Sequence, residues 1–168
     1  MRLLRCDLNT PLGQIILLHN GEALVALNWG DGLDRALAHL QRHLPAWTEE
    51  RVSAIHGCTD ALSAYFSGEI EALSAVRVDP PGTPFQKRVW TTLATIPPGE
   101  AWAYKDLAAR IGQPTAQRAV AGANGKNPIP LIIPCHRVIA AGGRLGGFSC
   151  GLHRKAWLLN HEGIAFSA

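Results

Sequence analysis

Cysteine, histidine and arginine stand side by side in the segment PLIIPCHRVIAAGG, residues 130–143, where the surrounding pattern is apolar. A thiolate is a strong nucleophile, and a nearby imidazole can take the thiol proton. Successive side chains of a strand point to opposite faces, so Cys135 and His136 can cooperate only across a turn or through a bridging water. Pro134 favours such a turn. The residue types indicate thiol chemistry, and a buried structural cysteine is the alternative.

A carboxylate on the far side of His136 would orient the imidazole. The C-terminal half offers three acids, namely Glu100, Asp106 and Glu162.

The net charge differs between the two halves of the chain. Residues 1–80 hold six Lys/Arg and ten Asp/Glu, a net of −4, whereas residues 81–168 hold ten and three, a net of +7. This imbalance favours a polyanionic partner for the C-terminal half, with ordinary variation in composition as the alternative.

The first half of the chain predicts a small sheet covered by helices. Strands are expected at residues 2–8, 14–19, 23–27 and 76–78, with turns at NTPLG and at Asn20-Gly21. Helices are expected at 31–44, with Asp31 as its cap, and at 59–68, with Leu62, Tyr65 and Phe66 facing inward and Gly68 at its end. The prolines of DPPGTP, residues 79–84, interrupt either element and predict domains at 1–79 and 80–168.

The second half predicts helices. Thr83 can cap a helix that buries Phe85, Val89, Trp90 and Leu93, and a last helix spans 152–163. Between them, helices at 103–112 and 115–125, the second capped by Thr115, have the form of a helix-turn-helix. The second of these is rich in alanine and glycine and could approach a minor groove about 6 Å wide. A buried, alanine-rich core helix is the alternative.

The remaining residues of chemical interest favour ordinary roles. Cys6, Cys58, Cys135 and Cys150 form no CxxC pair, and we expect reduced thiols. His39 and His43 have helical spacing without a zinc-protease glutamate, which indicates a solvated helix face. The chain has no export signal and no apolar run long enough to span a bilayer, so we expect a cytoplasmic protein that does not bind membranes.

The motif PCHRVI resembles the active-site motif of the O6-alkylguanine-DNA alkyltransferases. The segments TPFQKRVW, IPPGEAWAYKDLA, RAVAGANGKNPIPLIIPCHRVI and GGFSCGLHRKAWLLNHEG follow the same family's pattern in order and spacing. The resemblance is strong over residues 83–163 and weaker before them. It implies an α+β fold, in which a small ribonuclease H-like sheet domain precedes a helical domain with a helix-turn-helix.

The resemblance also implies an activity, that of a methylated-DNA--protein-cysteine S-methyltransferase. Such a protein flips O6-alkylguanine, and by the same likeness O4-alkylthymine, out of double-stranded DNA that it binds through the minor groove. It then moves the alkyl group irreversibly to its own cysteine, once per molecule. No cofactor is expected, and the protein is expected to be a monomer.

The resemblance assigns the catalytic and binding roles of the family to the matching residues of this chain. Cys135 would accept the alkyl group, and His136, oriented by Glu162, would take the thiol proton through a water. Tyr104 would protonate the leaving guanine, and Asn127 would brace the turn that holds the cysteine. Expected DNA contacts are Thr115, Arg118, Ala119, Gly122, Lys126 and Arg137, with Arg118 filling the space of the flipped nucleotide. Expected pocket residues are Val138, Phe148 and Ser149.

Two positions depart from the family pattern. Phe148 stands where many members have tyrosine, and Cys150 stands where glycine is usual. Cys150 could narrow the pocket or disfavour a backbone shape that glycine adopts freely. Some members bind zinc in the N-terminal domain. Cys6, Cys58, His19 and His56 do not reproduce such a ligand pattern, so no metal is expected.

Three other functions fit parts of the sequence. Alkyltransferase-like proteins recognise alkylguanine without repairing it, but they lack the acceptor cysteine, and Cys135 is present. A transcription regulator reads the major groove with polar side chains, which the alanine- and glycine-rich helix lacks. A cysteine hydrolase would turn over repeatedly and need no DNA.

Overall fold

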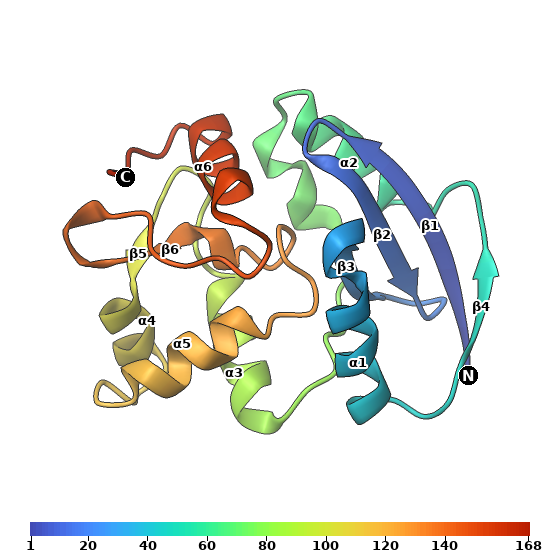
Figure 1. Ribbon diagram of the computed structural model, residues 1–168, viewed down its shortest axis with the longest axis horizontal. Coiled ribbons are helices and arrows are strands. Elements are labelled where there is room, and N and C mark those ends of the chain that lie inside the picture. The colour runs from blue at the N-terminus through green and yellow to red at the C-terminus, as the bar shows by residue number, and fades with distance from the viewer. The chain divides into compact units, whose positions relative to one another are not determined.

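The computed structural model describes residues 1–168, which form two compact units, Met1–Gly82 and Thr83–Ala168 (Figure 1). The division falls inside the proline-rich segment DPPGTP, where neither helix nor strand is formed before Pro84. No helix in the chain has both the length and the apolar character needed to cross a membrane.

A four-stranded sheet with the order β3-β2-β1-β4 forms the frame of the N-terminal unit. β1 (Arg2–Thr10), β2 (Gly13–His19) and β3 (Leu24–Trp29) pair antiparallel in sequence order, which confirms the expected hairpin and third strand. β4 (Thr48–Arg51) adds to β1 in parallel. The sequence did not predict β4, because its residues TEER are all exposed at the sheet edge and have no apolar alternation.

Two helices accompany this sheet. α1 (Leu33–His43) packs Leu40 against buried residues of the strands, and α2 (Thr59–Phe66) buries Leu62 and Tyr65 (Figure 1).

Three expectations about the N-terminal unit were wrong in detail, concerning Asp31, Phe66 and the strand at 76–78. Asp31 lies in a short 3-10 turn, so Gly32 caps α1. Phe66 is half-buried, and the strand is reduced to one bridge between Leu24 and Val78.

The C-terminal unit is mainly helical. Its four α-helices are α3 (Pro84–Leu93), α4 (Tyr104–Arg110), α5 (Gln117–Gly125) and α6 (Leu152–His161). The start of α3 is fixed by a reciprocal capping box. The Thr83 hydroxyl accepts from the Gln86 backbone N–H at 3.2 Å, and the Gln86 side chain accepts from the Thr83 N–H at 2.9 Å. The predicted cap at Thr83 is therefore confirmed.

A short two-stranded ladder decides where the reactive residues of this unit lie. β5 (Trp102–Ala103) pairs in parallel with β6 (Val138–Ile139). Tyr104 follows β5 directly, and the turn Cys135–Arg137 ends where β6 begins. The ladder thus brings two segments that are distant in sequence to one place. Strands of two residues are too short for a periodic signal, and the sequence did not predict them.

Helices α4 and α5 are the predicted helix-turn-helix, and they lie side by side in Figure 1. Val120 and Ala123 are buried on α5, and the indole of Trp90 on α3 donates to the Ala123 carbonyl at 2.8 Å. Ala119 and Gly122 are exposed on the other side. The bare side of α5 therefore faces solvent and not the core. Thr115 does not cap this helix, because Ala116 occupies that position.

Candidate active site

Cys135 begins a single 3-10 turn, Cys135–Arg137, which supplies the turn predicted at Pro134. The residues before it form a second turn that Asn127 closes. The Asn127 amide donates to the Ile133 carbonyl at 2.8 Å and accepts from the Ile129 N–H at 2.9 Å. Within this turn Leu131 has φ of 77°, a left-handed conformation that costs a branched residue about 1–2 kcal/mol. The hydrogen bonds of Asn127 hold this strained backbone in place.

His136 and Glu162 form a buried hydrogen-bonded pair. The His136 Nε2 lies 2.5 Å from the Glu162 carboxylate, and both side chains are fully buried. Arg137 donates hydrogen bonds to the other carboxylate oxygen of Glu162 from Nε, at 3.0 Å, and from Nη2. Its Nη1 donates to the Ile96 carbonyl at 2.8 Å. The carboxylate of Glu162 therefore orients the imidazole of His136, and the guanidinium of Arg137 neutralises the charge of that carboxylate.

Cys135 and His136 rest uncharged beside the charged carboxylate of Glu162. Burial raises the pKa of the Cys135 thiol to about 12, helped by the neighbouring Cys150 and opposed by Asn127 and Lys155. Burial also lowers the pKa of His136 and outweighs its bond to Glu162. The bonds from His136 and Arg137 hold the pKa of Glu162 down, although burial acts to raise it. At neutral pH this gives a thiol, a neutral imidazole and a carboxylate.

A neutral imidazole next to the thiol can act as a base. His136 Nδ1 is buried without a hydrogen-bond partner, while its Nε2 is bound to Glu162. No hydrogen bond joins the thiol directly to His136. This arrangement fits the sequence-based expectation that the two groups communicate through an intermediate.

The thiol opens onto a cavity of about 190 Å³. The cavity is lined by Tyr104, Ala121, Asn124, Gly125, Cys135, Gly147, Phe148 and Ser149. Burial raises the pKa of Tyr104, so its hydroxyl keeps its proton at neutral pH and can donate it. Helix α5, the turn of Cys135 and the loop before α6 thus line one partly open cavity.

Lys155 ties the end of the turn of Cys135 to the loop that supplies Gly147 to the cavity wall. Its ammonium is fully buried and donates to the Val138 carbonyl at 2.7 Å and to the Gly147 carbonyl at 2.9 Å. Burial lowers the pKa of Lys155 to about 8. Lys155 was not among the residues expected at the site. The available signal was a lysine in line with the buried Leu158 and Leu159 of α6, where the pattern asks for an apolar side chain.

Three expectations about the site are corrected by the structure. Arg137 does not offer its charge to DNA, because it is 6% exposed and bound to Glu162 and Ile96. Val138 does not line the cavity, and its carbonyl accepts a hydrogen bond from Lys155. Cys150 neither lines the cavity nor has a left-handed backbone, so the glycine-specific shape is not required there.

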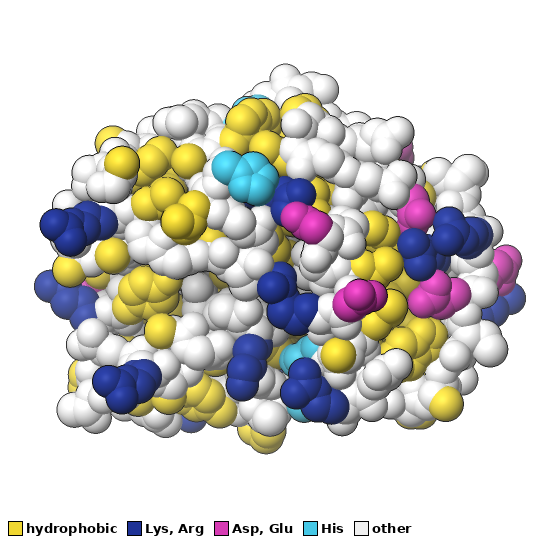
Figure 2. Space-filling view, in the orientation of Figure 1, with side chains coloured by type: hydrophobic (Ala, Val, Ile, Leu, Met, Phe, Trp, Pro, Cys, Tyr) yellow, Lys and Arg dark blue, Asp and Glu magenta, His cyan; other side chains and the backbone are white.

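The other five expected DNA contacts lie on one exposed surface along α5. Thr115, Arg118, Ala119, Gly122 and Lys126 are all exposed, and a side chain built at Gly122 would meet nothing within 4 Å. Lys and Arg side chains are spread over the visible face of the C-terminal unit, whereas Asp and Glu lie mainly over the N-terminal unit (Figure 2). The charge division of the sequence is therefore also a division of surface.

Fold and site together define a class of protein: an α+β chain whose helical unit carries a helix-turn-helix beside an enclosed cysteine, histidine and glutamate. Family comparison gives this class a name. Residues 84–164 match the 6-O-methylguanine DNA methyltransferase DNA-binding domain, and residues 6–80 match the ribonuclease-like domain of the same enzymes. The chain belongs to the 6-O-methylguanine DNA methyltransferase family.

Individual relatives agree along nearly the whole chain. The methylated-DNA--protein-cysteine methyltransferase of Shigella flexneri is 41% identical over 166 residues, 97% of each chain. That of Mycobacterium tuberculosis is 43% identical over 155 residues, 92% of this chain and 89% of the relative. The crystal structure of Mycobacterium tuberculosis OGT in complex with DNA superposes with a TM-score of 0.79 at 38% identity, covering 95% of this chain and 92% of the other.

Proposed function

We propose that this protein repairs O6-alkylguanine in double-stranded DNA by moving the alkyl group to Cys135. The single observation that carries the proposal is the Cys135 residue, which lines a partly open cavity and is followed in the chain by His136, itself bonded to Glu162. The names of the relatives, and the DNA bound to one of them, support the choice of substrate.

The proposed reaction transfers one alkyl group and two protons. His136 Nδ1 takes the Cys135 proton through a water, and Glu162 stabilises the imidazolium that forms. The thiolate then attacks the alkyl carbon. A carbon–sulfur bond forms as the bond from carbon to O6 breaks, and the Tyr104 hydroxyl supplies a proton to the departing guanine. The product thioether has no route back to the thiol, so each molecule reacts once.

A base within a duplex cannot reach an enclosed thiol, so the nucleotide must leave the stack. We propose that α5 lies in the minor groove, because its exposed side is nearly bare and the groove is narrow. Arg118 would enter the space that the nucleotide leaves. Alkylated guanine pairs poorly, which lowers the cost of its extrusion, and the same route would admit O4-alkylthymine. We further propose that the protein acts as a monomer in the cytoplasm, without cofactor or metal.

The test is to mix the protein with a duplex that contains one O6-methylguanine and to measure the intact protein mass. We expect the gain of one methylene group, mapped to Cys135 by peptide analysis and saturating at one per protein. Cys135→Ala should bind the duplex without any change in mass. Binding without a mass change in the wild type would place the protein with non-repairing relatives. Repeated turnover would indicate a hydrolase.

A further inference from the structure

The segment after α6, residues 164–167, which we call the strap, runs beside the loop that follows β6 (Figure 1). The Ser167 N–H donates to the Gly143 carbonyl at 2.8 Å, and the Leu145 N–H donates to the Ser167 carbonyl at 2.9 Å. Two residues after Leu145 the loop reaches Gly147, the first of three loop residues that line the cavity. The strap therefore holds the loop just before it enters the cavity wall.

Apolar packing reinforces the strap. Ile139, Leu159 and Ile164 form a small buried cluster. Leu145 of the loop and Phe166 of the strap both pack against this cluster. Ile139 belongs to β6 and Leu159 to α6, so the strap and the loop are attached to regular elements of the C-terminal unit. Burial of these side chains favours the strap in its place along the loop.

The loop needs anchors from outside because its own backbone is permissive. Residues 140–149 include four glycines, and three of them have a positive φ. Glycine loses more conformational freedom on folding than any other residue, so contacts with other segments must order such a loop. The strap supplies these contacts at Gly143 and Leu145, and Lys155 supplies another at the Gly147 carbonyl.

We propose that the strap positions the cavity wall for alkyl transfer, through the Ser167 backbone and the Phe166 side chain. This inference rests on the proposed function. Transfer requires the alkyl carbon to lie about 3–3.5 Å from the Cys135 sulfur and in line with it. A displaced wall would let the substrate lie farther away or at a poorer angle. The strap residues do not line the cavity, so they act only through the loop.

The experiment removes one backbone hydrogen bond from the strap. Ser167→Pro deletes the N–H that bonds the Gly143 carbonyl and keeps the carbonyl that accepts from Leu145. Ser167 is exposed, so the change leaves the buried cluster intact. Single-turnover transfer from a duplex with one O6-methylguanine is followed by protein mass at several protein concentrations. This series separates the limiting rate from the concentration that gives half of it.

We expect Ser167→Pro to lower the limiting rate about tenfold, because a misplacement of about 1 Å can cost on the order of 100-fold. The half-maximal concentration and the final stoichiometry of one methyl group per protein should not change. Hydrogen exchange in a peptide of residues 141–149 should become about fivefold faster, the factor for one net hydrogen bond of about 1 kcal/mol. Ser167→Ala, the conservative variant, keeps the N–H and should match the wild type.

A second pair of variants tests the strap through its packing, and it decides the question if Ser167→Pro does not fold. Phe166→Ala should also lower the limiting rate at constant stoichiometry. Phe166→Leu keeps an apolar side chain against the cluster and should recover most of the rate. Phe66→Ala removes the same ring from a half-buried position of α2 in the N-terminal unit and should leave the rate unchanged.

The other outcomes would overturn the inference, each for a different reason. Faster exchange with an unchanged limiting rate would show that the position of the loop does not matter for transfer. Reduced stoichiometry in both Ser167→Pro and Phe166→Ala, with a normal rate for the active molecules, would give the strap a folding role only. A raised half-maximal concentration alone would assign it to DNA binding. Absence of transfer in the wild type would instead overturn the proposed function.

Discussion

At the scale of single residues, the site keeps its nucleophile protected. Cys135 is 2% exposed, and burial raises the pKa of its thiol to about 12. Burial, helped by the nearby charge of Arg137, lowers the pKa of His136 although Glu162 acts to raise it. In the proposed reaction the thiol is used once, and a thiol that reacts slowly with free electrophiles is preserved for that reaction.

This protection predicts the pH dependence of Cys135 toward a small reagent such as iodoacetamide. The thiolate is the reactive form, so below a pKa of about 12 its fraction, and the alkylation rate, should rise about tenfold per pH unit. Peptide mass analysis between pH 7 and 10 measures the rate at Cys135, with Cys135→Ser as the control. A rate that levels off near pH 8 would show that the thiolate already forms there, contrary to this prediction.

At the scale of elements, α5 has two different sides. Val120 and Ala123 anchor it in the unit, while Ala119 and Gly122 leave its outer side nearly bare around Arg118. A helix with this outer surface suits a narrow groove better than a wide one, since it offers few groups that could read base edges. Arg118 is the one charged residue within α5, and its exposed position predicts a role that depends on a duplex.

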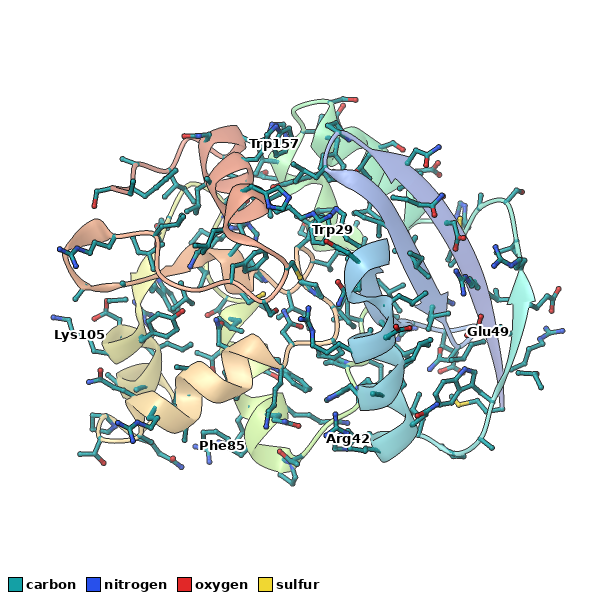
Figure 3. All side chains as sticks on the ribbon, viewed as in Figure 1. Trp29, Arg42, Glu49, Phe85, Lys105 and Trp157 are labelled. Atoms are coloured by element: carbon teal, nitrogen blue, oxygen red, sulfur yellow. The ribbon has the colours of Figure 1, made fainter.

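Arg118→Ala should therefore slow transfer from a duplex lesion by about tenfold or more, because extrusion of a base costs a few kcal/mol. Transfer from free O6-benzylguanine, which needs no extrusion, should change little. Both rates follow from the protein mass over time. Lys105→Ala, an exposed cation on α4 (Figure 3), is the matched control and should leave both reactions unchanged. Equal slowing of both reactions would rule out the wedge role.

At the scale of the whole molecule, charge is divided between the two units. The C-terminal half carries a net charge of +7 and the N-terminal half −4. Figure 2 shows the same contrast on the visible surface. Cations that neutralise phosphates release counterions, so binding to DNA depends on salt in proportion to the number of such contacts. We expect the phosphate contacts to come from the basic C-terminal unit.

Affinity for a lesion-free duplex should accordingly fall linearly in a plot of log K against log salt concentration. Lys126→Ala should reduce the slope by about one, the value expected for one lost phosphate contact. Arg42→Ala, on the exposed side of α1, should leave the slope unchanged. Fluorescence anisotropy over a salt series gives both slopes. An identical effect of the two substitutions would contradict a binding surface confined to the C-terminal unit.

The sequence by itself determined the local features. The capping box at Thr83, the turn at Pro134, the helix-turn-helix and the reactive pair Cys135-His136 all depend on neighbours within a few residues. The family pattern over residues 83–163 added the fold and the activity. These signals are local in the chain or repeated at fixed spacing, and both kinds can be recognised in the sequence without the tertiary structure.

The tertiary structure decided which side chains meet. His136 and Glu162 are 26 positions apart, and the β5–β6 ladder, too short for any periodic signal, is what brings Tyr104 near Cys135. The family resemblance placed Arg137 among the expected DNA contacts. Burial reversed that assignment, since a guanidinium enclosed beside a carboxylate must pair with it. The partners of a buried polar group depend on long-range packing, and that packing is absent from the local pattern.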